Sequence, residues 1–274
     1  MQYKIVFCDI DGTLIDSKHR VSAGTKQKIQ QLHRIGIPFV LVSARMPSGI
    51  FPIRRELALQ SPIICYSGAL ILDKSGDCVM SACISSELAS AVDSFISKEF
   101  KNVCSSAFFH NKWMVSDASN AWVVQEQRIT SSVPSEGKLS CLAAPEGHVH
   151  KFLCMGEAGQ IADLTLAVSE KYPELSVYRS KDTYLEIMDG AVSKSNAVRF
   201  LCSDYAISID AAVSFGDNYN DVDMLLATGV GFAMGNAPEE VKRQVGNVTL
   251  SNDDEGVLAG LQQLSFFGNS SNDL

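Results

Sequence analysis

Residues 5–13 read Ile5-Val6-Phe7-Cys8-Asp9-Ile10-Asp11-Gly12-Thr13, and this stretch decides the fold. Its four apolar side chains predict a buried strand that ends in a turn carrying two carboxylates and a hydroxyl. Because side chains alternate along a strand, Asp9 and Asp11 point the same way. One aspartate at such a strand end can attack phosphorus while the other exchanges protons. The spacing therefore favours phosphoryl transfer.

The elements around this strand alternate between apolar runs and helical patterns. In the first half of the chain, the pattern of apolar residues predicts strands at 4–10, 37–42 and 62–66 and a helix at 22–35. The pattern resumes near the C-terminal end, with helices at 194–203 and 221–228 and strands at 211–215 and 230–233. Alternating strands and helices are typical of a parallel sheet. We therefore predict an α/β fold with a doubly wound, Rossmann-like parallel sheet.

The pattern of predicted helices and strands changes in the middle of the chain. A hairpin at 70–80 is followed by helices near 87–100, 120–129 and 159–171, with short strands between them. This mixture indicates an inserted α+β domain. We expect a catalytic core formed by 1–80 and 190–274, and an inserted domain at 81–189.

The bulk composition excludes several classes of partner. The chain has 274 residues, 46% of them hydrophobic, and a formal charge of -8. An acidic chain without a basic stripe is a poor ligand for nucleic acid or anionic lipid. No apolar stretch approaches the roughly 20 residues of a spanning helix, and acids come too early for a signal peptide. We expect a cytoplasmic protein, and oligomeric state is not predicted.

The cysteines do not form a recognisable metal or disulfide motif. Eight of them are scattered without a Cys-x-x-Cys pair. Several stand in apolar runs, where a thiol acts as a small hydrophobe. A zinc or disulfide role is therefore disfavoured.

A second acidic turn follows the predicted strand at 211–215. It reads Gly216-Asp217-Asn218-Tyr219-Asn220-Asp221. Magnesium prefers hard oxygen donors, and a few carboxylates with a substrate phosphate satisfy it. The turn therefore predicts a magnesium site that includes Asp217 and Asp221.

Four aspartates beside a phosphate would repel one another strongly. A divalent cation and Lys194, at the start of a predicted helix, are the candidates for the compensating positive charge. Two further strand ends offer contacts to a phosphoryl group. They are Ser43 with Arg45 behind it, and Ser67-Gly68. All these groups are expected to meet at one edge of the sheet, where open α/β folds bind ligands.

Together these motifs resemble the haloacid dehalogenase (HAD) superfamily, and in particular its Cof-type sugar-phosphate phosphatases. The resemblance covers nearly the whole chain and rests on four motifs in order: Asp9-x-Asp11-x-Thr13, Ser43, Lys194 and Gly216-Asp217-x-x-Asn220-Asp221. The long insert between the second and third motifs resembles the family's type-two (C2B) cap domain, which closes over the active site and selects the substrate.

The resemblance also implies roles for individual residues. Asp9 would be the nucleophile that forms an aspartyl-phosphate, and Asp11 the acid that protonates the leaving alcohol and then activates water. Magnesium would be held by Asp9, the backbone carbonyl of Asp11 and Asp217, with Asp221 supporting it through water. The phosphate-binding residues would be Ser43, Lys194 and Asn220, with Ala44, Arg45, Ser67 and Gly68 beside them. The substrate would be a small phosphorylated metabolite.

Two positions depart from the family pattern. The family usually has Thr-Gly-Arg where this chain has Ser43-Ala44-Arg45, and Asn-Gly where it has Ser67-Gly68. Serine keeps the hydroxyl, so the phosphate chemistry is expected to be retained. The changes bear on how a substrate fits near Arg45 and Ser67.

Two other functions stay open at the level of sequence. A phosphomutase or phosphotransferase would pass the phosphoryl group from Asp9 to a second hydroxyl instead of water. A non-enzymatic signalling protein would use Asp9 as a long-lived phosphoacceptor. Asp11 and the large insert argue against the signalling protein, because a poised acid/base and a lid promote turnover.

Overall fold

The computed structural model describes residues 2–130, 132–137 and 149–264. The chain forms two compact units. The first contains Met1–Ala44, Ile50–Asp77 and Ser193–Leu274, and the second contains Arg45–Gly49 and Cys78–Val192. The expected domain boundaries at 80/81 and 189/190 stay a prediction.

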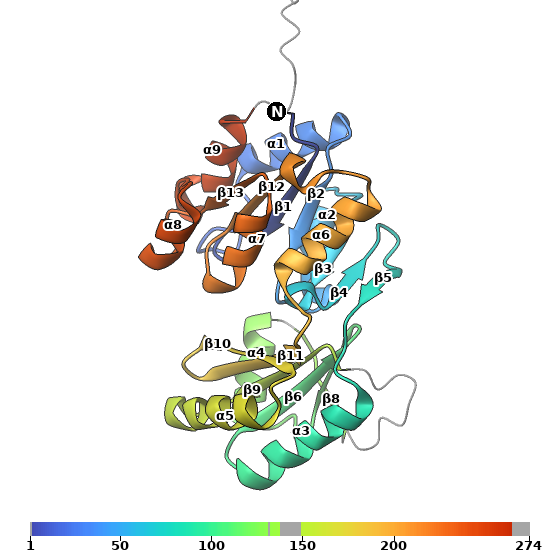
Figure 1. The fold of residues 1–274 in the computed structure, drawn as a ribbon, viewed down its shortest axis with the longest axis vertical. Coiled ribbons are helices and arrows are strands. Elements are labelled where there is room, and N and C mark those ends of the chain that lie inside the picture. The colour runs from blue at the N-terminus through green and yellow to red at the C-terminus, as the bar shows by residue number, and fades with distance from the viewer. Residues whose placement is uncertain (1, 131, 138–148, 265–274) are drawn as a thin grey trace, which may run out of the picture. The chain divides into compact units, whose positions relative to one another are not determined.

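A seven-stranded sheet forms the centre of the first unit (Figure 1). Its strands in spatial order are β13 (Val230–Ala233), β12 (Ala212–Gly216), β1 (Ile5–Asp9), β2 (Phe39–Val42), β3 (Ile63–Cys65), β4 (Leu70–Leu72) and β5 (Cys78–Ser81). The first five are parallel, and β4 runs antiparallel to β3. By residue assignment, β5 belongs to the second unit although it completes this sheet. The predicted α/β class is confirmed.

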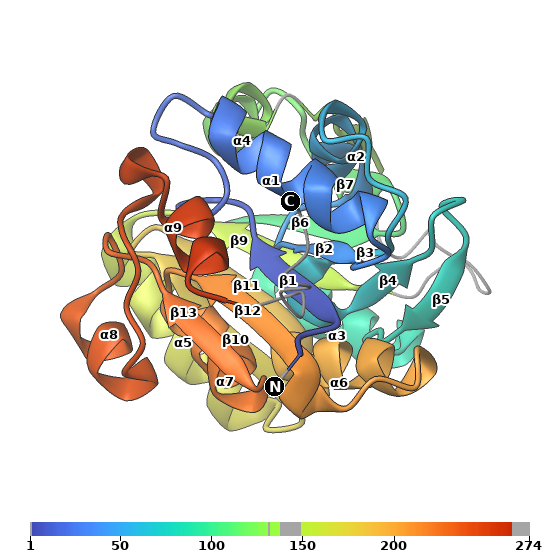
Figure 2. The same cartoon turned by 90° about the horizontal axis from the view of Figure 1, so that it is seen from above.

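Helices cover both faces of this sheet, which explains its continuous apolar strands. Every residue of β1, β2, β3 and β12 is buried, as expected for parallel strands packed on both sides. The helices of this unit are α1 (Ala23–Arg34), α2 (Pro47–Glu56, from Ile50 onward), α6 (Lys194–Asp204), α7 (Val222–Ala227), α8 (Glu239–Val245) and α9 (Gly256–Gln262). Figure 2 shows α1 and α9 on one face and α6 and α7 on the other.

The strand order places a topological switch beside β1. From β1 the chain builds β2 and β3 on one side, and later β12 and β13 on the other. Cys8 of β1 is paired in register with Phe215 of β12. The carboxyl ends of these two strands therefore lie side by side, at the place where open α/β sheets bind ligands.

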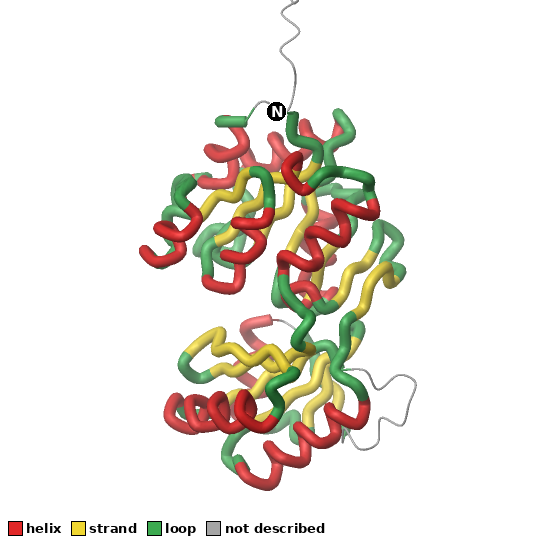
Figure 3. Tube along the Cα trace, in the orientation of Figure 1, coloured by secondary structure: helices red, strands yellow, loops and turns green. Residues whose placement is uncertain are grey.

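The second unit contains a six-stranded sheet, drawn in yellow in Figure 3. Its order is β10 (Leu175–Lys181), β11 (Tyr184–Asp189), β9 (Lys151–Met155), β6 (Cys104–Phe109), β7 (Lys112–Val115) and β8 (Ser135–Glu136). Only the β7–β8 pair is parallel. Its helices are α3 (Ser86–Glu99), α4 (Ala121–Thr130) and α5 (Ala158–Lys171), and side chains of α3 and α5 form a buried core with this sheet. The predicted α+β character of the insert is confirmed.

Two helices of the first unit were missed by the periodicity analysis. The α2 segment contains Pro47, Gly49 and Pro52, which mask a helical pattern. The α9 segment contains Gly260, where a Cβ atom would come within 2.5 Å of the Phe215 ring. A glycine that looks like a helix breaker is therefore the residue that lets α9 approach the sheet.

Two further observations concern membrane-spanning helices and the cysteines. No described helix combines the length and the apolar composition that crossing a bilayer requires. The cysteines in the described ranges are free thiols, and Cys141 lies outside those ranges.

Candidate active site

Three aspartates from separate parts of the chain converge at the carboxyl edge of the parallel sheet. Asp9 ends β1, Asp217 directly follows β12, and Asp221 ends the short 3-10 helix η4 (Tyr219–Asp221). One carboxylate oxygen from each lies within 4.8 Å of the others. Asp9 and Asp221 are buried and Asp217 is half-buried. The predicted meeting of the two acidic turns is therefore present.

Lys194 lies among these carboxylates. It is the first residue of α6 and its side chain is 1% exposed. Its Nζ donates to Asp9 Oδ1 at 2.5 Å and also to Asp221 Oδ1. One ammonium against three carboxylates leaves a net charge of -2 when all four are ionised. That excess equals the charge of one divalent cation.

Backbone and hydroxyl donors orient two of the carboxylates. Asp221 Oδ2 accepts from the N–H groups of Asp217 and Asn218, each at 3.0 Å. Thr13 Oγ1 donates to Asp217 Oδ1 at 2.7 Å. The remaining oxygen of Asp221 contacts Lys194. These bonds hold the two carboxylates in place.

Gly12 lets the first acidic turn approach the second. Its φ is +80°, and a Cβ atom at this position would come within 2.3 Å of Asp217 Oδ2. The backbone conformation and the close contact both require glycine. Gly12 therefore allows Asp9 and Asp217 to share one site.

We expect Gly12→Ala to lower kcat/KM by about 10- to 100-fold, because displacement of a reacting or ligand group by about 1 Å has effects of that size. Steady-state kinetics with saturating Mg2+ will measure it. Gly36→Ala is the matched control, since Gly36 has the same φ of +80° but has no atom within 4 Å of its Cβ position. Equal kinetics of the two variants would contradict the steric argument.

The electrostatics of the metal-free cluster follow from burial. Burial raises the pKa of Asp9 well above its ordinary value, although attraction by Lys194 opposes this. Burial, followed by repulsion from Asp221, raises the pKa of Asp217 to about 6. Burial lowers the pKa of Lys194, but attraction by Asp221 and Asp9 outweighs it, so the net pKa is raised. The Lys194 ammonium is therefore charged. It does not supply enough positive charge to balance the carboxylates around it.

The raised pKa of Asp217 predicts how stability depends on pH. With a pKa of about 6 against an ordinary 3.8, the folded chain binds this proton more tightly than the unfolded chain does. The contribution of Asp217 therefore makes the metal-free protein more stable as pH falls from about 7 towards 4. A divalent cation should raise Tm more at about pH 7.5 than at about pH 5, where protons compete for the same oxygens.

Thermal unfolding with EDTA or with Mg2+ at the two pH values checks this expectation. Asp217→Asn is the control, because its amide does not titrate and should reduce both the pH effect and the Mg2+ effect. A Tm increment from Mg2+ that is equal at both pH values in the wild type would contradict the assignment.

The predicted phosphate contacts form a second group at the same edge. Ser43 directly follows β2, is 1% exposed, and accepts through its backbone carbonyl from Ser67 N–H at 2.9 Å. A Cβ atom on Gly68 would come within 2.3 Å of the Ser193 carbonyl oxygen. Gly68 therefore lies against the residue that precedes Lys194. The structure thus links Ser43, Ser67 and Gly68 to the start of α6.

Ser67 is one of the departures from the family pattern, and its backbone gives that departure a physical meaning. Its φ is +53°, and Tyr66 before it has a φ of +51°. Asparagine enters this left-handed region more readily than most other residues. Serine therefore carries more strain here than the usual asparagine would.

The other predicted residues are placed as follows. Asp11 is exposed and forms a backbone bridge with Ile15, while Asn220 is half-buried within η4. Ala44 ends the first segment of the first unit. Arg45 belongs to the second unit, where its Nη1 donates to Gly49 O at 3.2 Å. The functional roles of these residues stay predictions.

Two contributors were missed. Thr13 was recognised only as part of a motif, yet its hydroxyl holds Asp217. Asn236 Nδ2 donates to the Gly12 carbonyl at 2.8 Å, and its Oδ1 accepts from Asn252 N–H. Asn236 follows β13, so its place after another parallel strand was the signal that could have found it.

The acid cluster fits a divalent metal site. Its donors in the described residues are carboxylate oxygens, which suit hard cations such as Mg2+. The net charge and the burial favour a divalent cation over a monovalent one.

Comparisons with known proteins agree with this geometry. The model of the haloacid dehalogenase-like hydrolase family matches residues 6–261. A putative phosphatase of Haemophilus influenzae is 35% identical over 263 residues, which cover 96% of this chain and 98% of the relative. The structure of TM0651 from Thermotoga maritima has a TM-score of 0.86 at 28% identity, over 96% and 98% of the two chains. BT4131, a HAD subclass IIB sugar phosphatase, shares the fold with a TM-score of 0.81 at 20% identity, over 96% and 100%.

Proposed function

This chain belongs to the haloacid dehalogenase-like hydrolases and is a phosphatase of the Cof type, and we propose that it hydrolyses small phosphomonoesters with Mg2+ through an aspartyl-phosphate on Asp9. The observation that carries the proposal is the contact of Lys194 with Asp9 and Asp221 beside Asp217. This arrangement sets a carboxylate nucleophile among groups that can hold a phosphate and a cation.

In the first half-reaction an oxygen of Asp9 attacks phosphorus in line with the leaving alcohol. The bond from phosphorus to the alcohol oxygen breaks, and Asp11 gives that oxygen a proton. In the second half-reaction Asp11 takes a proton from water, whose oxygen attacks phosphorus. The bond between Asp9 and phosphorus then breaks, which releases inorganic phosphate and restores the carboxylate.

The remaining residues neutralise charge on the phosphoryl group and position it. Lys194 orients Asp9 through the 2.5 Å hydrogen bond and would neutralise a phosphoryl oxygen as charge develops. The Ser43 hydroxyl, Gly68 and Asn220 would position the phosphate. Asp9, the carbonyl of Asp11, Asp217 and Asp221 would hold Mg2+, and the ion would supply charge neutralisation of the phosphoryl oxygens.

Sugar phosphates are the proposed substrate class. The support is the resemblance of the four motifs to Cof-type sugar-phosphate phosphatases. We propose that the inserted domain, about 81–189, acts as the type-two cap and selects the leaving group. We also propose a cytoplasmic location, to which the free thiols in the described part of the chain are suited.

A phosphate-release assay against sugar, nucleotide and cofactor phosphates tests the function. We expect Mg2+-dependent release of inorganic phosphate, with sugar phosphates among the best substrates and no turnover in EDTA. Product analysis by ³¹P NMR distinguishes hydrolysis from the two alternative functions. An isomerised sugar phosphate without free phosphate would show a mutase or phosphotransferase. A stable phosphoprotein without turnover would show a signalling phosphoacceptor.

A further inference from the structure

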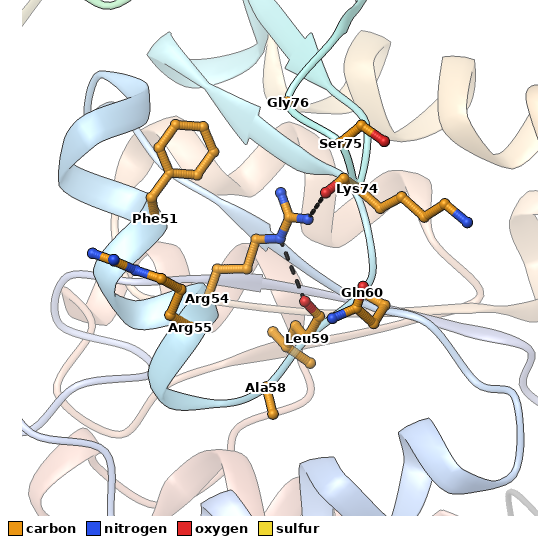
Figure 4. Close-up of a pocket in the computed structure, with 9 residues that line it drawn as sticks. All are labelled: Phe51, Arg54, Arg55, Ala58, Leu59, Gln60, Lys74, Ser75 and Gly76. Carbon is orange, nitrogen blue, oxygen red and sulfur yellow. Dashed lines mark hydrogen bonds between the residues drawn. The ribbon is translucent and has the colours of Figure 1, made fainter.

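The first unit contains a surface recess that is separate from the acid cluster. It has a volume of about 580 Å³ and is formed by the end of α2, the segment that follows it, and the turn between β4 and β5 (Figure 4). That volume falls in the range of small-molecule pockets. It is open at the protein surface, and all of its lining residues lie within Ile50–Asp77.

The recess lies at the opposite edge of the sheet from the candidate active site. Its residues Leu59 and Gln60 come just before β3 begins at Ile63. Because β3 is parallel to β2, and β2 to β1, the start of β3 lies at the edge away from Asp9. A ligand in this recess would therefore not occupy the phosphoryl-transfer site.

Arg54 forms the floor of the recess and is 8% exposed. Its guanidinium donates to three backbone carbonyls, those of Leu59 at 3.4 Å, Asp73 at 3.2 Å, and Lys74. Carbonyl oxygens carry only partial charge, so these bonds fix the side chain without neutralising it. A guanidinium has five N–H donors, which leaves two beyond the three contacts. Arg54 thus provides a fixed, buried positive charge.

Two more cations border the recess. In Figure 4 Arg55 lies on the helix side and Lys74 on the turn side, with the Arg54 guanidinium between them. Both side chains are exposed. Among the described residues, none of the three cations makes an ion pair within 4.0 Å. The nearby Asp73 carboxylate attracts the Arg54 guanidinium but makes no ion pair with it within 4.0 Å. It accepts backbone N–H groups of its own turn, from Ser75 and Asp77.

The charge of this recess is opposite to that of the chain. Three cations and no acidic residue line it, although the formal net charge is -8. A concave surface with one sign of charge concentrates ions of the opposite sign. Arginine pairs well with carboxylate and phosphate groups, and the half-buried Phe51 ring adds an apolar wall for the carbon skeleton of a ligand.

We propose that this recess is a binding site for a small organic anion that carries at least two negative charges. Arg54 would provide the fixed donor, Arg55 and Lys74 would close on the anionic groups, and Phe51 would contact the carbon skeleton. A phosphate ester and a polycarboxylate share this chemistry.

Isothermal titration calorimetry on the metal-free full chain tests the proposal, with citrate and glycerol 3-phosphate as separate probes. The protein is treated with EDTA and then exchanged into a chelator-free, phosphate-free buffer, because EDTA is itself a polycarboxylate and would compete for the recess. Without a cation, the acid cluster repels anions. The wild type is expected to bind at least one probe with a Kd tighter than about 1 mM at low ionic strength. An Arg55→Gln/Lys74→Gln variant should bind it at least about tenfold more weakly. A preference between the probes identifies the anionic group.

The control variant is Lys4→Gln/Arg243→Gln, which removes the same charge at exposed positions outside the recess. It should bind as the wild type does, and all three proteins should show the same Tm, because Arg54 is kept. Equal binding by the recess variant and the wild type would overturn the proposal. So would an equal loss in the control, or no binding of either probe by the wild type at that Kd.

Discussion

Replacing Asp9 by asparagine is expected to lower kcat for phosphate release by at least about 10⁴-fold, because removal of a covalent nucleophile has effects of that order. The amide of the Asp9→Asn variant cannot form the aspartyl-phosphate, although its oxygen can still accept from Lys194. The fold should survive, since the side chain keeps its size. A continuous phosphate-release assay with Mg2+, together with circular dichroism, measures both properties.

Asp204→Asn is the matched control for this experiment. Asp204 is an exposed acid at the end of α6, and its neutralisation should leave kcat unchanged. Trapping of a ³²P-labelled protein adds a second measurement, because wild type should be labelled at Asp9 and the variant should not. A variant that keeps the wild-type rate would remove Asp9 from the mechanism.

Lys194→Met is expected to lower both activity and stability. It removes the cation that contacts Asp9 and Asp221 and leaves two buried carboxylates without that partner. Breaking a buried ion pair in this way costs about 3–5 kcal/mol of stability. We expect kcat/KM to fall by at least about 10³-fold, since a fixed positive charge at the phosphoryl group is lost.

Urea unfolding and steady-state kinetics measure the two effects of Lys194→Met. Mg2+ should recover part of the lost stability, because it also neutralises the carboxylates, but it should not restore the rate. Lys242→Met is the control, as its ion pair with Glu239 includes an exposed carboxylate. If Lys194→Met were as stable as the wild type in EDTA, Lys194 would not be balancing the buried acids.

Much of the fold was predictable because its signals are local. The mainly apolar runs at β1, β2 and β12 are short, and a polar side chain stands at the end of each strand or directly after it. Those patterns predicted a parallel sheet and the side chains at its carboxyl edge. The helix α2 was missed because proline and glycine occur inside it, and tertiary packing overrides such weak local preferences.

The sequence by itself determined which residues stand at the strand ends and at the start of α6, and thus that Asp9, Asp217 and Lys194 could share a site. Only the tertiary structure decided which atoms meet. It set the two hydrogen bonds of Lys194, the hold of Thr13 on Asp217, and the carbonyls around Arg54. Strand formation depends on neighbours along the chain, whereas the contacts of Lys194 and Thr13 join residues at least 27 positions apart in sequence. They exist because packing of the whole sheet and its helices brings the backbones within hydrogen-bonding distance.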